Sequence, residues 1–180
     1  AYLQASNFLA SITSSNGNND TASFTLIFSG SNINDFADLT LTSFYGTEKT
    51  YRSMQTASAA NGTVSGSYVI FATGSSSGSY RDNLAAAITS STGHGNLLNL
   101  SSSDGTLRSS IHLRQVVGGS DGNTSITFSD QLTGSLESIS TTGFSGGVTR
   151  FTVTQSDSKV FITQASRGPN GNTSITHNAD

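Results

Sequence analysis

The sequence predicts a mainly β protein: a β-sandwich-like module of short antiparallel strands, with one short helix packed on a sheet. Many short segments alternate apolar and polar residues, which is the pattern of half-buried strands. Much of the polarity comes from Ser, Thr, Asn and Gly, and the 19 glycines among 180 residues favour turns over helices. A single segment, residues 79–90, has apolar residues at helical spacing.

The first part of the chain contains expected strands separated by turn signals. Residues 1–20 form an N-terminal lead-in segment that ends in the turn signal Asn16–Asp20. Residues 45–48 turn one strand into the next, so that the two form a hairpin, and residues 56–63 are expected to form a surface loop. The strands expected here are 23–28, 38–44, 49–52 and 64–72.

The expected helix begins at Ser79, which is a good N-cap, and has Asp82 in its first turn. Three consecutive alanines, 85–87, raise its helix propensity, and Thr92-Gly93 ends it. Because the apolar stripe is narrow, we expect the helix to lie against a sheet. The stripe consists of Tyr80, Leu84 and Ile88.

The second half of the chain is expected to contain only strands and turns. Residues 103–105 form a hairpin turn, residues 131–147 are looser, and residues 156–158 turn the last hairpin. The strands expected here are 96–101, 106–117, 123–129, 149–155 and 159–165.

A six-residue sequence occurs twice in the chain. Gly122–Thr127 returns letter for letter as Gly171–Thr176, and alternating residues before the two copies also match. Such self-similarity indicates a repeated supersecondary unit. We expect both copies to adopt the same backbone conformation, with Ile126 and Ile175 facing the core. The matching residues are Ile111, Leu113, Gln115 and Gly119 against Val160, Ile162, Gln164 and Gly168.

The repeat sets the expected domain organisation. Residues 21–147 form a β-rich module with one helix, and residues 148–180 form a partial C-terminal repeat of a hairpin plus a strand. The partial repeat has no helix to cover its apolar positions, and Lys and Pro, the usual guards of sheet edges, are scarce. We therefore expect it to pair with a neighbouring chain. The alternative is that it folds back on the first copy and closes a two-sheet sandwich.

Composition argues against several classes of partner. Only 11% of residues are charged, and the net charge of −3 comes without a basic cluster, so we expect no nucleic-acid partner. Apolar runs do not exceed five residues, so we expect no membrane span. The chain has no cysteine, which excludes disulfides and thiolate metal sites.

No residues form a convincing catalytic or metal-binding motif, and we expect no catalytic, cofactor or metal site. The histidines at 94, 112 and 177 lack metal-ligand spacing; His94 is expected in a loop and His112 on the solvent side of a strand. Gly118–Gly122 matches the nucleophile elbow in letters alone, because a strand rather than a helix follows it. Glu48 and Glu137 are the only glutamates, and nothing places either near an aspartate.

Two further features have both a structural and a functional interpretation. Asp121–Asn123 could offer oxygen ligands to Ca²⁺, but turn formation already explains an Asx-Gly pair. Four tyrosines could form a sugar-stacking surface, although core and cross-strand packing is their more common use. These are Tyr45, Tyr51, Tyr68 and Tyr80.

Several short motifs follow one another in a recognisable order. They are Asn32–Asp38, the hairpin Leu41–Tyr51, the helix segment Asn83–Ile88, Gly93-His94-Gly95, Gly122–Thr127 and Gly143–Gly147. This succession, over about residues 21–147, resembles a module that recurs in large virion structural proteins of tailed bacteriophages, marine phages in particular. The resemblance implies a building block of a phage particle.

We therefore expect a non-enzymatic virion structural protein: a capsid decoration, a head fibre or a tail component. The resemblance implies that it acts in the extracellular particle, as a homo-oligomer and with other virion proteins as partners. The alternative is a carbohydrate-binding fibre domain or a bacterial surface adhesin, with a host surface glycan as its partner, because a neutral polar surface also suits hydrogen bonding to sugars.

Overall fold

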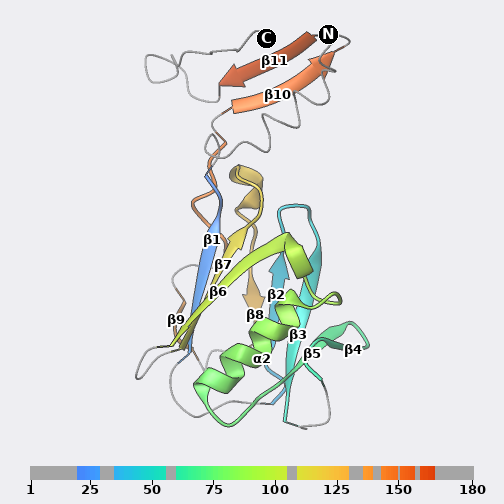
Figure 1. The fold of residues 1–180 in the computed structure, drawn as a ribbon, viewed down its shortest axis with the longest axis vertical. Helices are drawn as coiled ribbons and strands as arrows, with labels where there is room; N and C mark the ends of the chain where they lie inside the picture. The colour runs from blue at the N-terminus through green and yellow to red at the C-terminus, as the bar shows by residue number, and fades with distance from the viewer. Residues whose placement is uncertain are drawn as a thin grey trace, which may run out of the picture.

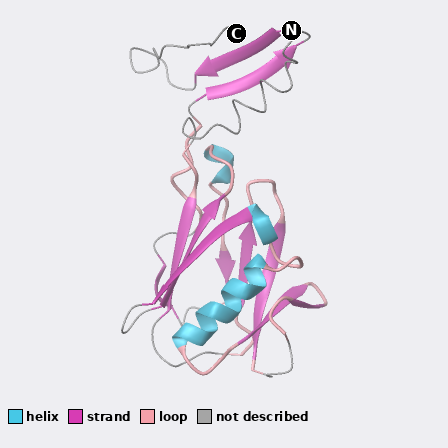
Figure 2. Cartoon of the chain, viewed as in Figure 1, coloured by secondary structure: helices cyan, strands magenta, loops and turns pink. Residues whose placement is uncertain are grey.

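The computed structural model describes residues 20–28, 35–55, 60–104, 109–129, 136–139, 143–149, 151–156 and 159–164. It confirms the predicted fold class: the protein is mainly β, with two mostly antiparallel sheets and one helix packed between them (Figures 1 and 2). In this part of the chain no helix is long and apolar enough to cross a membrane.

One sheet has four antiparallel strands in the order β6-β7-β1-β9. β1 occupies its predicted range, and its burial alternates because every second side chain faces the other sheet. β9 is not predicted by the sequence pattern, since it lies in the stretch 131–147 that we expect to be looser. The strands are β1 Ser23–Phe28, β6 Leu98–Asp104, β7 Ser109–Gln115 and β9 Leu136–Ile139.

The other sheet has five strands in the order β4-β5-β3-β2-β8, and only the β3–β5 pair is parallel. The predicted β2–β3 hairpin is confirmed: the Ser43 N–H donates to the Thr47 carbonyl (2.9 Å) across its turn. The strands are β2 Asp38–Thr42, β3 Glu48–Met54, β4 Thr63–Ser65, β5 Tyr68–Ala72 and β8 Thr127–Phe128.

Three of the predicted strands need correction. Residues 64–72 are not one strand, because Gly66 adopts φ +60°, which favours glycine, and turns the chain between β4 and β5. The strand predicted at 96–101 begins only after the 3₁₀ helix η1, Gly95–Leu97. The strand predicted at 123–129 is reduced to β8, because the residues before it make the contacts described below.

The helix α2, Ser77–Thr89, lies where the sequence predicts a helix, but the predicted N-cap, Ser79, is wrong by about one turn. Ser76 is the N-cap, and Ser79 completes a capping box with it: each side chain bonds the backbone N–H of the other. Asp82 therefore lies beyond the first turn, and the helix ends at the C-cap Ser90. The three residues of the predicted apolar stripe are all fully buried.

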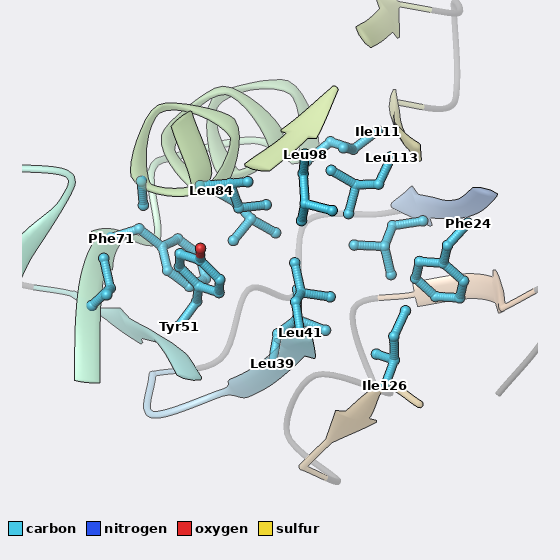
Figure 3. Packing of buried hydrophobic residues seen from close by; sticks show 14 of the residues in the cluster. Phe24, Leu39, Leu41, Tyr51, Phe71, Leu84, Leu98, Ile111, Leu113 and Ile126 are labelled. Carbon is cyan, nitrogen blue, oxygen red and sulfur yellow. The ribbon is translucent and has the colours of Figure 1, made fainter. Parts of the chain in front are cut away.

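The core fills the space between the two sheets and α2 (Figure 3). Leu84 of α2 and Leu98 of β6 approach Leu39 and Leu41 of β2 from the opposite side. Burying aliphatic side chains of this kind typically contributes about 1.5–3 kcal/mol each. The helix thus closes the sandwich along one side, against β5 of one sheet and β6 and β7 of the other.

The predicted C-terminal hairpin is confirmed as β10, Phe151–Ser156, and β11, Lys159–Gln164. The two strands pair antiparallel over their full lengths, with Val153 opposite Ile162. They form a two-stranded sheet of their own, which is drawn apart from the two larger sheets in Figure 1. The second copy of the six-residue sequence, Gly171–Thr176, lies outside the described residues, as does the lead-in before Asp20.

Candidate functional site

The two glycine-bearing motifs Gly122–Thr127 and Gly143–Gly147 lie against each other beyond the end of β7. Ser125 and Gly143 form a β-bridge, and the Phe144 N–H donates to the Thr124 carbonyl (2.9 Å). We call the group consisting of Gln115, Asn123, Thr124 and residues 143–147 the Gln115 lock.

Gln115 is the centre of this lock, because its fully buried side chain connects the two sheets. The Phe44 N–H donates to its Oε1 (2.7 Å), and its Nε2 donates to the Thr42 carbonyl (3.1 Å) and to Thr124 Oγ1 (3.2 Å). The Thr124 hydroxyl donates to the same Thr42 carbonyl (2.6 Å). The end of β7 is thereby fastened to the turn that follows β2.

Asn123 fastens the second motif to the first. Its Nδ2 donates to the Gly147 carbonyl, and the Gly147 N–H donates to its Oδ1, both at 2.9 Å. Gly147 also has no room for a side chain, because a Cβ there would lie 2.3 Å from the Gly119 carbonyl oxygen. Asn123 and Gly147 of the two motifs therefore serve the close packing of one backbone segment against another.

Ile126 follows the lock and is 5% exposed within the core cluster, which confirms that it faces the core. The matching Ile175 lies outside the described residues, so the equivalence of the two copies stays a prediction.

A second buried polar group joins η1 to the β2–β3 hairpin. His94 lies in the turn before η1, a loop position as predicted, and it is only 2% exposed. Its Nε2 lies 3.1 Å from the Thr47 carbonyl, which can only accept, so Nε2 carries the proton. Its Nδ1 then accepts from the Tyr51 hydroxyl (2.6 Å), which in turn accepts from the His94 N–H (3.1 Å). Burial lowers the pKa of His94 and raises that of Tyr51.

We expect the free energy of unfolding to fall as the pH drops below about 6.5, the ordinary pKa of histidine. The lowered pKa keeps His94 neutral in the folded state. Below this pH the unfolded chain therefore binds the proton more readily, which stabilises the unfolded state relative to the folded state. The slope from this one group cannot exceed about 1.4 kcal/mol per pH unit. Denaturant unfolding measured from pH 7.5 to pH 5 checks the expectation.

Two variants test whether this pH dependence of the unfolding free energy comes from His94. His94→Gln should flatten the acid loss of stability. His112→Gln is the comparison variant, because His112 is exposed on β7, as predicted, beside the Thr25 hydroxyl (2.9 Å). A slope that survives in His94→Gln would contradict the assignment to His94.

The other predicted candidates are not brought together. Ser120 and Asp121 lie in the 3₁₀ helix η2, Ser120–Gly122, and the Ser120 hydroxyl contacts that of Thr149 (3.1 Å), which fits the turn interpretation. Glu48 begins β3 and Glu137 lies in β9 of the other sheet. His177 lies outside the described residues, and within them no three His, Cys, Asp or Glu residues gather as a metal site.

The four tyrosines do not form one surface. Tyr51 and Tyr80 are fully buried, whereas Tyr45 is exposed and Tyr68 is half-buried. Tyr68 belongs to a small polar group on the five-stranded sheet. There Arg52 makes two 2.6 Å hydrogen bonds to the Asp38 carboxylate and places its guanidinium carbon 3.5 Å from the Tyr68 ring centroid.

Sequence reasoning missed the roles of Gln115 and Arg52, although each left a signal. Gln115 continues the alternation of Ile111 and Leu113, so the pattern places its side chain on the buried face of the strand. A buried polar side chain needs hydrogen-bond partners. Asp38 and Arg52 stand opposite each other once the β2–β3 hairpin is given its register.

Comparison with protein-family models, with curated proteins and with solved structures finds no match to this chain.

Proposed function

We propose that the protein is a non-enzymatic structural component of a tailed-phage particle and acts through assembly contacts. The motif order in residues 21–147, which resembles a virion module, supports the phage context. The geometry supports a non-enzymatic role, because the buried side chains of Gln115 and His94 make their hydrogen bonds to other groups of the fold.

The C-terminal hairpin is the observation that carries this proposal. An isolated two-stranded sheet is marginally stable in water and gains stability when a further strand or a covering surface is added. β10 and β11 form such a sheet, and the large side chain of Phe161 is 51% exposed on it. A partner that covers or extends the hairpin would remove this exposed apolar surface from water.

Removal of the hairpin tests the proposal. The truncated chain should end after Arg150, because the module uses the two residues before it. Val148 is bridged to Asp20, and the Thr149 hydroxyl oxygen accepts from the Ser120 N–H (3.0 Å). We expect full-length protein to self-associate or to join particles, and the truncated chain to stay folded and monomeric. Light scattering on the purified proteins, with circular dichroism as the folding control, checks this.

Two results would reject assembly through the hairpin. One is a full-length protein that stays monomeric at high concentration and fails to join particles. The other is a truncated chain that associates as strongly as the full-length protein.

A second candidate function is glycan binding, as a fibre domain or an adhesin. The group of Asp38, Arg52 and Tyr68 favours it, because an aromatic ring beside hydrogen-bonding groups suits a sugar. The Thr40 and Thr50 hydroxyls, 2.8 Å apart, extend the same face of the sheet. Binding of monomers to a glycan array, lost in Tyr68→Ala, would favour this function over assembly.

A further inference from the structure

β6 is the longest free edge among the described strands of the two large sheets. It has seven residues, whereas the other edge strands have four in β9, three in β4 and two in β8. Lys, Pro and bulges usually protect such edges against the addition of another strand. β6 has none of these: its sequence is Leu-Asn-Leu-Ser-Ser-Ser-Asp, and its register with β7 is continuous.

The direction of the peptide groups of β6 follows from its neighbours. The Gln115 N–H donates to the Ala22 carbonyl, so this end of β7 bonds toward β1 through Gln115. In an antiparallel ladder the direction alternates, so Arg114 bonds toward β6 and meets Asn99 there. The next residue of β6, Leu100, then directs its peptide groups away from β7, as does Ser102.

These outward groups are unused. In the described part of the chain no hydrogen bond engages the outward peptide groups of Leu100 or Ser102. Residues 101–103 are also exposed. Near the end of the strand Arg81 of α2 donates to the Ser103 carbonyl (3.1 Å), which faces β7 by the same alternation, so this contact leaves the outward groups of Leu100 and Ser102 open.

We propose that the β6 edge accepts strand β11 from a second copy of this chain, which extends the four-stranded sheet across the interface. This inference rests on the proposed assembly function and names its contact surface. β11 has six residues, enough to cover the open portion of β6, and it is one of two free edges of a sheet that lacks further strands in the described chain. Backbone hydrogen bonds between an added strand and a free edge are a recurrent mode of recognition.

Charge favours β11 over β10 as the added strand. Each of the proposed partners has one charged residue, Asp104 at the end of β6 and Lys159 at the start of β11, whereas β10 has none. Antiparallel addition brings the end of one strand beside the start of the other. The strand ends that carry these two residues of opposite charge therefore meet in this arrangement and would be separated in a parallel one.

Cysteine cross-linking tests the contact directly, because the full-length chain has no cysteine of its own. Ser102→Cys and Phe161→Cys, which lie opposite each other when Asp104 is beside Lys159, are prepared as separate full-length variants, mixed and oxidised. We expect a mixed disulfide dimer in greater yield than with Ser65→Cys, on the short β4 edge, in place of Ser102→Cys. Equal yields from the two edges would overturn the assignment to β6.

A backbone variant gives an independent readout. Ser102→Pro removes an outward N–H and leaves the bonds to β7 in place, so the fold should persist while self-association is lost. Ser102→Thr keeps the N–H and should associate normally. Lys159→Glu should weaken association about two- to fivefold, and adding Asp104→Lys should restore it.

The outcomes separate this inference from the proposed function. If hairpin removal abolishes association but folded Ser102→Pro still associates, the β6 contact is wrong and the assembly function stands. If Ser102→Pro does not fold, the cross-linking result decides. A disulfide formed within a monomer that carries both cysteines would overturn the second-copy contact, because the hairpin then folds back on its own sheet. Absence of any association in the unaltered chain would reject both.

Discussion

Gln115→Leu is expected to lower the free energy of unfolding by about 2–4 kcal/mol, because it leaves buried polar groups without partners. Leucine has nearly the volume of glutamine, so the loss reports hydrogen bonds rather than a cavity. The Phe44 N–H would lose its acceptor at 2.7 Å, and Thr124 would lose the donor at 3.2 Å. The Thr42 carbonyl still accepts a hydrogen bond from the Thr124 hydroxyl, which limits the loss of stability. Denaturant titration of the two proteins measures the difference.

The adjacent position gives the matched control. Arg114 is exposed on the same strand, so Arg114→Leu should change stability by less than about 0.5 kcal/mol. Thr124→Val should cost less than Gln115→Leu, since Gln115 still donates to the Thr42 carbonyl in that variant. Equal losses in Gln115→Leu and Arg114→Leu would show that the Gln115 lock does not hold the sheets together.

Ile126→Ala is expected to cost about 2–4 kcal/mol, because it opens a cavity in a core that packs closely. Ile126 and Phe24 lie on the side of the core cluster away from α2 in Figure 3. Ser125→Ala, at the exposed neighbouring position, is the control and should stay within about 0.5 kcal/mol of the unaltered protein.

The same substitution in the second copy tests the repeat. If Gly171–Thr176 packs as Gly122–Thr127 does, Ile175→Ala should cost a similar amount. A cost below about 0.5 kcal/mol, which is typical of surface positions, would show that the two copies share letters and not a structure.

The sequence predicted those parts of the fold that depend on neighbouring residues. Strict alternation located β1, and the spacing of Tyr80, Leu84 and Ile88 located α2. The N-cap was wrong because the run Ser75–Ser79 offers several possible caps, and the reciprocal bonds of Ser76 and Ser79 select one of them.

Features that depend on distant residues could not be predicted in the same way. Gly66 lies between two serines inside the stretch 64–72 predicted as one strand, and the pairing of β4 with β5 shows that it forms a turn. The glycines on either side of His94 predict its place in a loop, but not its burial, which depends on a hydrogen bond from Tyr51, 43 positions earlier in the chain. For the candidate site the limit is similar: Asp38 and Arg52 form a group only when the hairpin register is known. The virion role stays a prediction.

The position of β1 in its sheet has a consequence for synthesis of the chain. β1 is a central strand, yet both of its neighbours, β7 and β9, come much later in the sequence. At 5–20 residues per second, the ribosome needs about 5–18 s to make the roughly ninety residues between paired positions of β1 and β7. During that interval the nascent strand cannot bury Phe24, Leu26 and Phe28 in its final sheet. Copies made side by side on one messenger thus carry unpaired apolar strands at the same time, and crowding at the ribosome favours pairing between chains.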